Sequence, residues 1–199
     1  MARGYPGYDV LAKWRTPSFD EKTREVVRRR IAQPPARRFF TGPEQRLVEA
    51  IVARLIPQPD RAEPIPLAAM LDAFMADGRG QGYRNEAMPP LEQALRVGLA
   101  AIEAEARTRF GRSFAEAAAE DQDAVLRAAQ SGEVDRAAWR GMDPATFFRE
   151  ALLKITAGLY YAHPAAWSEI GFGGPASPRG YVRLGLDESD PWEAREAAP

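Results

Sequence analysis

Acid–base chemistry in this chain could use one imidazole, since the sequence contains a single histidine, His163, and no cysteine. Tyr160, Tyr161 and Glu169 lie close to it in the sequence. Together these groups could form a general-base site in a pocket at the end of a helix. The alternative, which we favour, is a structural histidine that hydrogen-bonds a carbonyl of the last helical turn. The chain has no Gly-x-Ser-x-Gly motif of the kind that presents a nucleophilic serine.

Glycines near the C-terminus offer a second candidate for chemistry. Residues 171–176 (GFGGPA) formally fit the Gly-x-Gly-x-x-Gly/Ala pattern of dinucleotide-binding loops. That pattern binds a pyrophosphate only where it follows a strand and begins a helix. Here Pro175 and Pro178 oppose a helix, and no strand pattern precedes the glycines. We therefore expect no cofactor-binding residue in this chain.

Metal chemistry also lacks suitable ligands. A single histidine excludes zinc sites that need two, and the Glu-x-x-His pairs of di-metal helical bundles are absent. Adjacent acidic residues such as Glu120 and Asp121 are typical of a solvated helix face. We expect no metal ligand and no catalytic residue, so we do not expect this chain to be an enzyme by itself.

The composition is that of a globular protein without a strong charge bias. The chain has 199 residues, of which 45% are apolar and 28% charged, and its net charge is −1. This balance gives no overall attraction to nucleic acid or anionic lipid. Residues 1–40 are richer in basic side chains and could serve a regulatory or nucleic-acid-binding module. We expect no nucleic-acid partner, because no aromatic–basic platform accompanies them.

No segment has the length and apolarity needed to cross a membrane. The longest uncharged apolar stretch, residues 155–168, contains Pro164 and is shorter than the ~20 residues that a spanning helix needs. The N-terminus lacks the apolar region of a secretory signal. We therefore expect no membrane insertion and a cytoplasmic location, or a periplasmic one if a partner carries the export signal.

Helical periodicity runs through most of the chain, and strand alternation is nearly absent. Ser18 predicts the start of a first helix, and Thr41 with Glu44 forms a capping-box pattern before a second. Asp143, followed by proline, predicts the start of a strongly apolar helix. We predict an all-α fold, namely a single orthogonal bundle of six to eight helices.

The predicted bundle covers residues 37–162, between a basic N-terminal arm and helix (1–36) and an extended, Gly/Pro-rich C-terminal arm (163–199). The C-terminal arm is rich in aromatic residues, unlike a disordered tail. These side chains could be buried on the bundle or on a partner. We favour a partner, because so long an arm has few intramolecular reasons to exist. The residues that we predict to form this interface are Tyr160, Tyr161, His163, Trp167, Ile170, Phe172, Tyr181 and Trp192.

Several motifs, taken in order, resemble one known family. Phe39-Phe40-Thr41 leads into an apolar helix that ends before Pro57, residues 110–114 read FGRSF, and residues 171–174 read GFGG. From about residue 39 to residue 186 the chain resembles the gluconate 2-dehydrogenase subunit 3 family. The resemblance implies a small, all-helical, non-catalytic subunit of membrane-associated sugar and sugar-acid dehydrogenases.

In that family the chemistry belongs to a large flavin subunit of the glucose–methanol–choline type, often accompanied by a cytochrome. The resemblance thus implies that this chain binds such a subunit, which holds FAD, and helps it to mature or to be exported. Family members commonly begin with a twin-arginine signal, which this chain lacks. Two alternatives stay open: a stand-alone helical enzyme that uses His163, and a regulatory helical interaction module.

Overall fold

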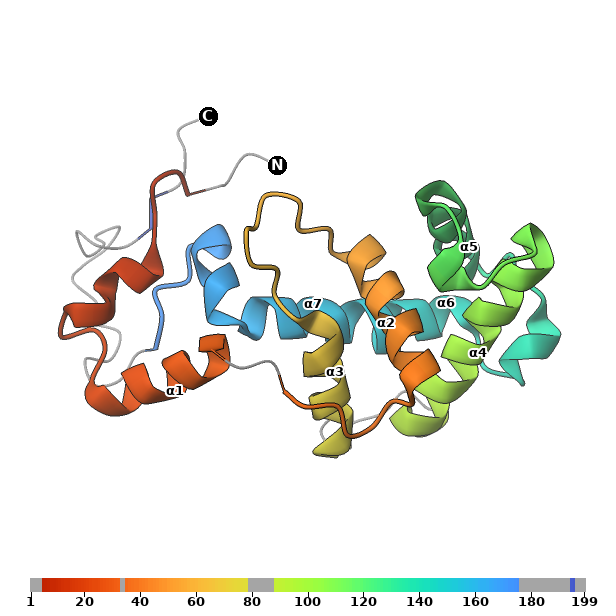
Figure 1. Ribbon diagram of the computed structural model, residues 1–199, viewed down its shortest axis with the longest axis horizontal. Helices are drawn as coiled ribbons and strands as arrows, with labels where there is room; N and C mark the ends of the chain where they lie inside the picture. The colour runs from red at the N-terminus through yellow and green to blue at the C-terminus, as the bar shows by residue number, and fades with distance from the viewer. Residues whose placement is uncertain (1–4, 33–34, 79–87, 176–193, 196–199) are drawn as a thin grey trace, which may run out of the picture. The chain divides into compact units, whose positions relative to one another are not determined.

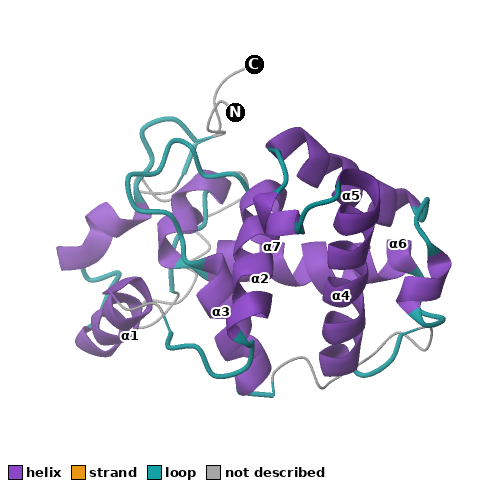
Figure 2. Ribbon diagram, turned by 45° about the vertical axis from the view of Figure 1, so that its right-hand side comes forward, coloured by secondary structure: helices purple, strands orange, loops and turns teal. Residues whose placement is uncertain are grey.

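The computed structural model describes residues 5–32, 35–78, 88–175 and 194–195, and these contain helices and loops without a strand (Figures 1 and 2). The predicted all-α class is confirmed. The chain divides into two compact units, which we call the central unit (Pro35–Leu159) and the terminal unit (Met1–Pro34 with Tyr160–Pro199). The segments predicted above as two separate arms therefore belong to one unit.

The central unit is built around its longest described helix, α4. Its elements are α2 (Gly42–Leu55), α3 (Leu67–Ala76), α4 (Leu91–Phe110), the 3-10 helix η2 (Phe114–Glu116), α5 (Ala119–Ser131), the 3-10 helix η3 (Arg136–Trp139), α6 (Pro144–Thr146), the π-helix η4 (Phe147–Leu153) and α7 (Lys154–Ala162), which continues into the terminal unit. Helix α4 contacts α5, η3 and η4, and it lies beside α5 in both views (Figures 1 and 2). Its buried face carries Leu95, Leu99 and Ile102.

Local hydrogen bonds define where the helices begin. The predicted capping box is confirmed: the Thr41 hydroxyl accepts from the Glu44 amide, and the Glu44 carboxylate accepts from the Thr41 amide at 2.8 Å. Asp143 caps α6 as predicted, at 2.8 Å from the Thr146 amide. The prediction of Ser18 as the first cap is wrong. Helix α1 (Glu21–Ala32) begins two residues later than expected, because the carboxylate of Asp20 accepts from the Thr23 amide at 2.7 Å.

A glycine lets α4 approach η4 closely. The ring of Phe147 lies against Gly98, where an added Cβ would be 2.2 Å from the nearest ring atom. Phe147 is fully buried and also packs edge-to-face on Trp139, with ring centroids 5.5 Å apart. The absence of a side chain at position 98 thus decides how closely these two elements pack.

The terminal unit combines residues that are distant in the sequence. Its elements are the 3-10 helix η1 (Val10–Arg15), α1, the C-terminal turn of α7 and the 3-10 helix η5 (Pro164–Ile170). Val10, Phe19, Val27 and Trp167 form its buried apolar cluster.

The prediction of an extended backbone from His163 onward is wrong over Pro164–Ile170, which form η5. His163 provides an N-cap acceptor for this short helix, and Pro164 occupies its first turn. The helix ends at Gly171, whose φ of 66° places it in the left-handed region. Because a 3-10 helix needs only a few residues per turn, it fits between breakers that would stop a longer α-helix.

The contact between Gly98 and Phe147 gives a direct test of the packing. We expect Gly98→Ala to lower the free energy of unfolding by about 2 kcal/mol, because the new methyl group overlaps the ring. The matched control is Gly158→Ala at an exposed position of α7, where no atom lies within 4 Å of the added Cβ. There we expect a gain of about 0.5–1 kcal/mol from the better helix propensity of alanine. Urea denaturation measures both, and equal effects of the two substitutions would contradict the packing argument.

Candidate functional site

His163, the single histidine of the chain, is buried between two backbone groups of the terminal unit. Its Nδ1 accepts a hydrogen bond from the Ala165 amide at 3.3 Å, and its Nε2 lies 3.1 Å from the carbonyl oxygen of Arg30. The neutral ring with its hydrogen on Nε2 satisfies both contacts, since Nε2–H then donates to that carbonyl. The carbonyl belongs to the last turn of α1, so the ring joins α1 to the start of η5.

The tyrosines beside His163 differ in exposure. Tyr160 is buried, and its hydroxyl donates to the Glu169 carboxylate, whose two oxygens lie 2.9 and 3.1 Å away. Tyr161 is 44% exposed and packs edge-to-face on the Tyr160 ring, with centroids 5.1 Å apart. Within this pair, Tyr161 is the one that presents its ring to solvent.

Trp167 contributes to the core of its own unit. Its side chain is 5% exposed and belongs to the buried cluster with Val10, Phe19 and Val27. Phe172 packs edge-to-face on its ring at a centroid distance of 5.2 Å and stays 36% exposed, and Ile170 is 46% exposed. Of the predicted interface residues, the structure therefore exposes Tyr161, Ile170 and Phe172 and buries Tyr160, His163 and Trp167. The other two, Tyr181 and Trp192, lie outside the described residues.

Exposed apolar side chains gather in the terminal unit. Among the described residues, the large apolar side chains with the greatest exposure are Val26, Ile31, Tyr161, Ile170 and Phe172, all from this unit. Helix α1 adds exposed basic side chains at Lys22, Arg28 and Arg29. The exposure of Val26 and Ile31 was not predicted from the sequence, because an apolar residue on an amphipathic helix is normally assigned to its buried face.

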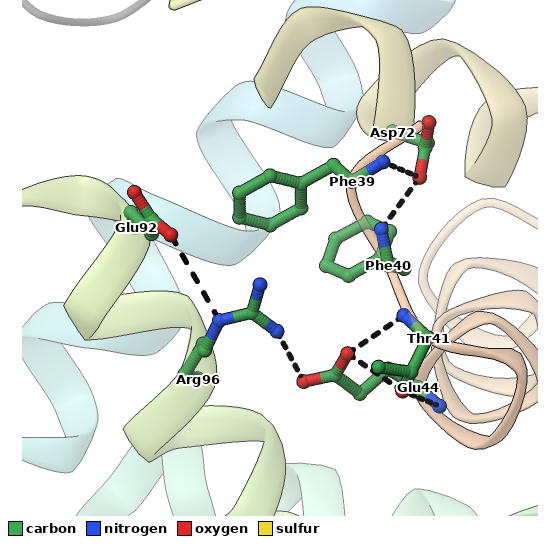
Figure 3. Close-up of polar contacts among 7 residues, drawn as sticks. All are labelled: Phe39, Phe40, Thr41, Glu44, Asp72, Glu92 and Arg96. Atoms are coloured by element: carbon green, nitrogen blue, oxygen red, sulfur yellow. Dashed lines mark hydrogen bonds and ion pairs between the residues drawn. The ribbon is translucent and has the colours of Figure 1, made fainter. Parts of the chain in front are cut away.

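A buried carboxylate organises the segment before α2 in the central unit. Asp72 of α3 is fully buried and accepts hydrogen bonds from three consecutive backbone amides, those of Arg38, Phe39 and Phe40, at 2.6, 3.0 and 2.7 Å. Figure 3 shows the bonds from Phe39 and Phe40. These bonds compensate the cost of removing the carboxylate from water. They hold the backbone that leads directly into the Thr41 cap.

Arg96 of α4 connects that segment to the longest helix. One of its terminal nitrogens donates to Glu44 at 2.6 Å, its Nε lies 4.0 Å from Glu92, and its guanidinium lies 4.8 Å from the centre of the Phe39 ring (Figure 3). Partial burial by itself would raise the pKa of Glu44, but the hydrogen bonds from Thr41 and Arg96 outweigh it and lower that pKa below its ordinary value. The start of α2 is thereby tied to α4 by an ionised pair.

Neither the hydrogen bonds of Asp72 nor the contacts of Arg96 resemble a metal centre. Within the described residues, no three histidine or acidic side chains gather closely enough to hold a metal ion. Among the described helices, none combines the length and apolar composition of a membrane-spanning segment. What these surfaces offer is contact area, with exposed apolar side chains on the terminal unit and arginine with aromatic groups on the central unit.

Comparison with known proteins identifies a family. Residues 43–174 match the family described as gluconate 2-dehydrogenase subunit 3. The matched range runs from α2 to the glycines after η5 and leaves residues 5–32 of the terminal unit outside it. No curated protein and no solved structure matches the chain at a significant level.

The burial of Trp167 predicts unequal effects for two neighbouring aromatic residues. We expect Trp167→Ala to destabilise the terminal unit by about 3–5 kcal/mol, because it empties the buried cluster. Phe172→Ala removes a partly exposed ring and should cost about 1 kcal/mol. Hydrogen exchange of the amides in α1 and η5 reports the local stability, and equal losses in the two variants would contradict this assignment.

The lowered pKa of Glu44 predicts how its contribution depends on pH. We expect Glu44→Gln to lower the free energy of unfolding by about 1 kcal/mol at pH 7, because the charge that faces Arg96 is lost. The carboxylate stabilises the fold above its ordinary pKa of 4.5 and loses this effect as the pH falls through the lowered value. The difference between variant and wild type should therefore shrink on acidification. Denaturant unfolding at pH 7 and pH 3 checks this, and an unchanged difference would refute it.

Proposed function

Because the chain belongs to the gluconate 2-dehydrogenase subunit 3 family, we propose that it is a non-catalytic small subunit that binds the large flavin-dependent subunit of a dehydrogenase complex. The match over residues 43–174 is the observation that carries this proposal. The family is named for one subunit of a multi-subunit dehydrogenase. A chain of this family is thus expected to act through association with a larger protein.

The proposed partner is a flavoprotein of the glucose–methanol–choline type, and FAD belongs to that partner. A cytochrome subunit would complete the complex in some systems. The small subunit stabilises the large one or helps it to mature. These assignments follow from the resemblance stated above.

The terminal unit supports the proposal through its exposed apolar groups. Tyr161, Ile170 and Phe172 present apolar surface to solvent, and they belong to the unit that holds all of the exposed large apolar side chains of the described residues. Aromatic side chains are also frequent energetic anchors of protein interfaces. We therefore assign the contact with the large subunit to these three residues.

The arrangement of His163 favours the subunit over the enzyme alternative. A general base needs a ring nitrogen that can reach a substrate proton. In the structure, Nδ1 faces the Ala165 amide and Nε2 faces the Arg30 carbonyl. The hydroxyl of Tyr160 donates to Glu169, so these two members of that hypothetical site are paired with each other.

Co-expression with a large flavoprotein subunit from the same genome tests the proposal. We expect the two chains to co-elute in size-exclusion chromatography, with flavin absorbance in the shared peak. Ile170→Asp and Phe172→Asp should each weaken association about tenfold or more, because a charge would be buried at the interface. The matched control is Ala53→Asp on the exposed face of α2 in the central unit.

Two results would overturn the proposal. In the first, the wild-type chain stays monomeric beside a folded, flavin-loaded large subunit. In the second, the purified chain alone turns over a sugar or sugar acid and loses this activity on His163→Ala, which would establish the enzyme alternative.

A further inference from the structure

A groove lined by two arginines runs along α4 of the central unit. It has a volume of about 510 Å³ and lies between α4 and η3, and its lining includes Ala100, Ala104, Ala137 and Ala138. A second hollow of about 380 Å³ continues it toward Pro90 at the start of α4. The two hollows share Arg96 and Arg140, so they form one continuous surface feature, which we call the α4–η3 groove.

The floor of the groove is made of small side chains. Val97, Ala100 and Ala104 are spaced three and four residues apart along α4, so they lie on one face of the helix. Ala100 and Ala104 are exposed. Small side chains allow the backbone of another helix to pack near the lower end of the usual range of interhelical distances, about 8 Å. The shape of the floor therefore suits a helix laid along α4.

Two arginines, Arg96 and Arg140, line the groove. Arg96 donates to Glu44 through one terminal nitrogen, and its other terminal nitrogen makes no bond among the residues drawn in Figure 3. Arg140 is exposed, and no ion pair to it is found among the described residues. The end of the groove near Glu92 carries no excess of positive charge, because two carboxylates, those of Glu92 and Glu44, face the single guanidinium of Arg96. The unbalanced charge therefore lies at the Arg140 end.

The backbone at Arg140 adds a second observation. Its φ of 51° and ψ of 40° place it in the left-handed region, which is unfavourable for a residue with a side chain. Among the described residues, it is the only non-glycine with a positive φ. Glycine would adopt this conformation without strain. Arginine at position 140 therefore makes the fold less stable than glycine would.

We propose that the α4–η3 groove docks an acidic helical segment of the large flavoprotein subunit. The acidic side chains of that segment face Arg140, and its small or apolar side chains lie on the alanine floor. This inference rests on the proposed function and adds to it a contact surface on the central unit, separate from Tyr161, Ile170 and Phe172. Charge complementarity selects an acidic partner, and the small residues of the floor select a helix.

Two substitutions in the full chain, co-expressed with the large subunit, test the groove. Ala104→Trp fills the floor, and Arg140→Glu reverses the unbalanced charge. The matched controls are Ala53→Trp on α2 and Arg112→Glu after α4, both at exposed positions that do not line the groove. We expect each groove variant to weaken association about tenfold, and each control to leave it within about twofold. Circular dichroism and urea unfolding confirm that all variants fold.

Arg140→Gly separates binding from stability. This variant relieves the left-handed strain, so we expect stability at least equal to that of the wild type together with weaker association. We also expect wild-type association to weaken as ionic strength rises, and this salt dependence to be smaller for Arg140→Glu.

The outcomes discriminate between the two proposals. If the wild type binds and Ala104→Trp or Arg140→Glu binds equally well, the groove inference is wrong while the proposed function stands. If the wild type does not bind a folded large subunit, both are wrong. A benzophenone amino acid at position 104 identifies the occupant by cross-linking. Cross-links to an acidic helix of the large subunit support the inference, whereas cross-links to a second copy of this chain overturn it.

Discussion

Much of the central unit depends on the hydrogen bonds that the buried carboxylate of Asp72 accepts. A carboxyl group without exposure to water is tolerated only when its oxygens are hydrogen-bonded, and here three successive amides provide those bonds. Their positions orient the backbone just before α2, so that the Phe39 ring meets Arg96 and the Thr41 cap engages Glu44. One carboxylate on α3 thereby helps to place an arginine that lines the α4–η3 groove.

The terminal unit depends on a different constraint, because its core residues belong to two segments, one before and one after the central unit in the sequence. Trp167 lies inside the range that matches the family, whereas Val10, Phe19 and Val27, which cover it, lie outside that range. His163 adds a polar link between the same segments through the Arg30 carbonyl. Residues 5–32 therefore have a clear structural task, which is to bury an aromatic side chain of the family-matched segment.

The features predicted correctly from the sequence are those that depend on neighbouring residues. Each of the caps at Thr41 and Asp143 involves residues of a single four-residue segment. The apolar periodicity is sufficient to predict the all-α class. The role of Asp72 was not predictable, because the amides that it binds lie 32 to 34 residues away. Likewise, the burial of Trp167 depends on Val10, and nothing near position 167 distinguishes a core tryptophan from an interface one.

The composition of the terminal unit from two distant segments has a consequence for biosynthesis. On a translating ribosome, the central unit can complete its core before residues 163–170 have left the exit tunnel. Residues 5–32 emerge first, yet they must wait for Trp167 before their apolar cluster closes. The side chains of Val10, Phe19 and Val27 are therefore open to solvent or to molecular chaperones throughout most of the synthesis of this chain.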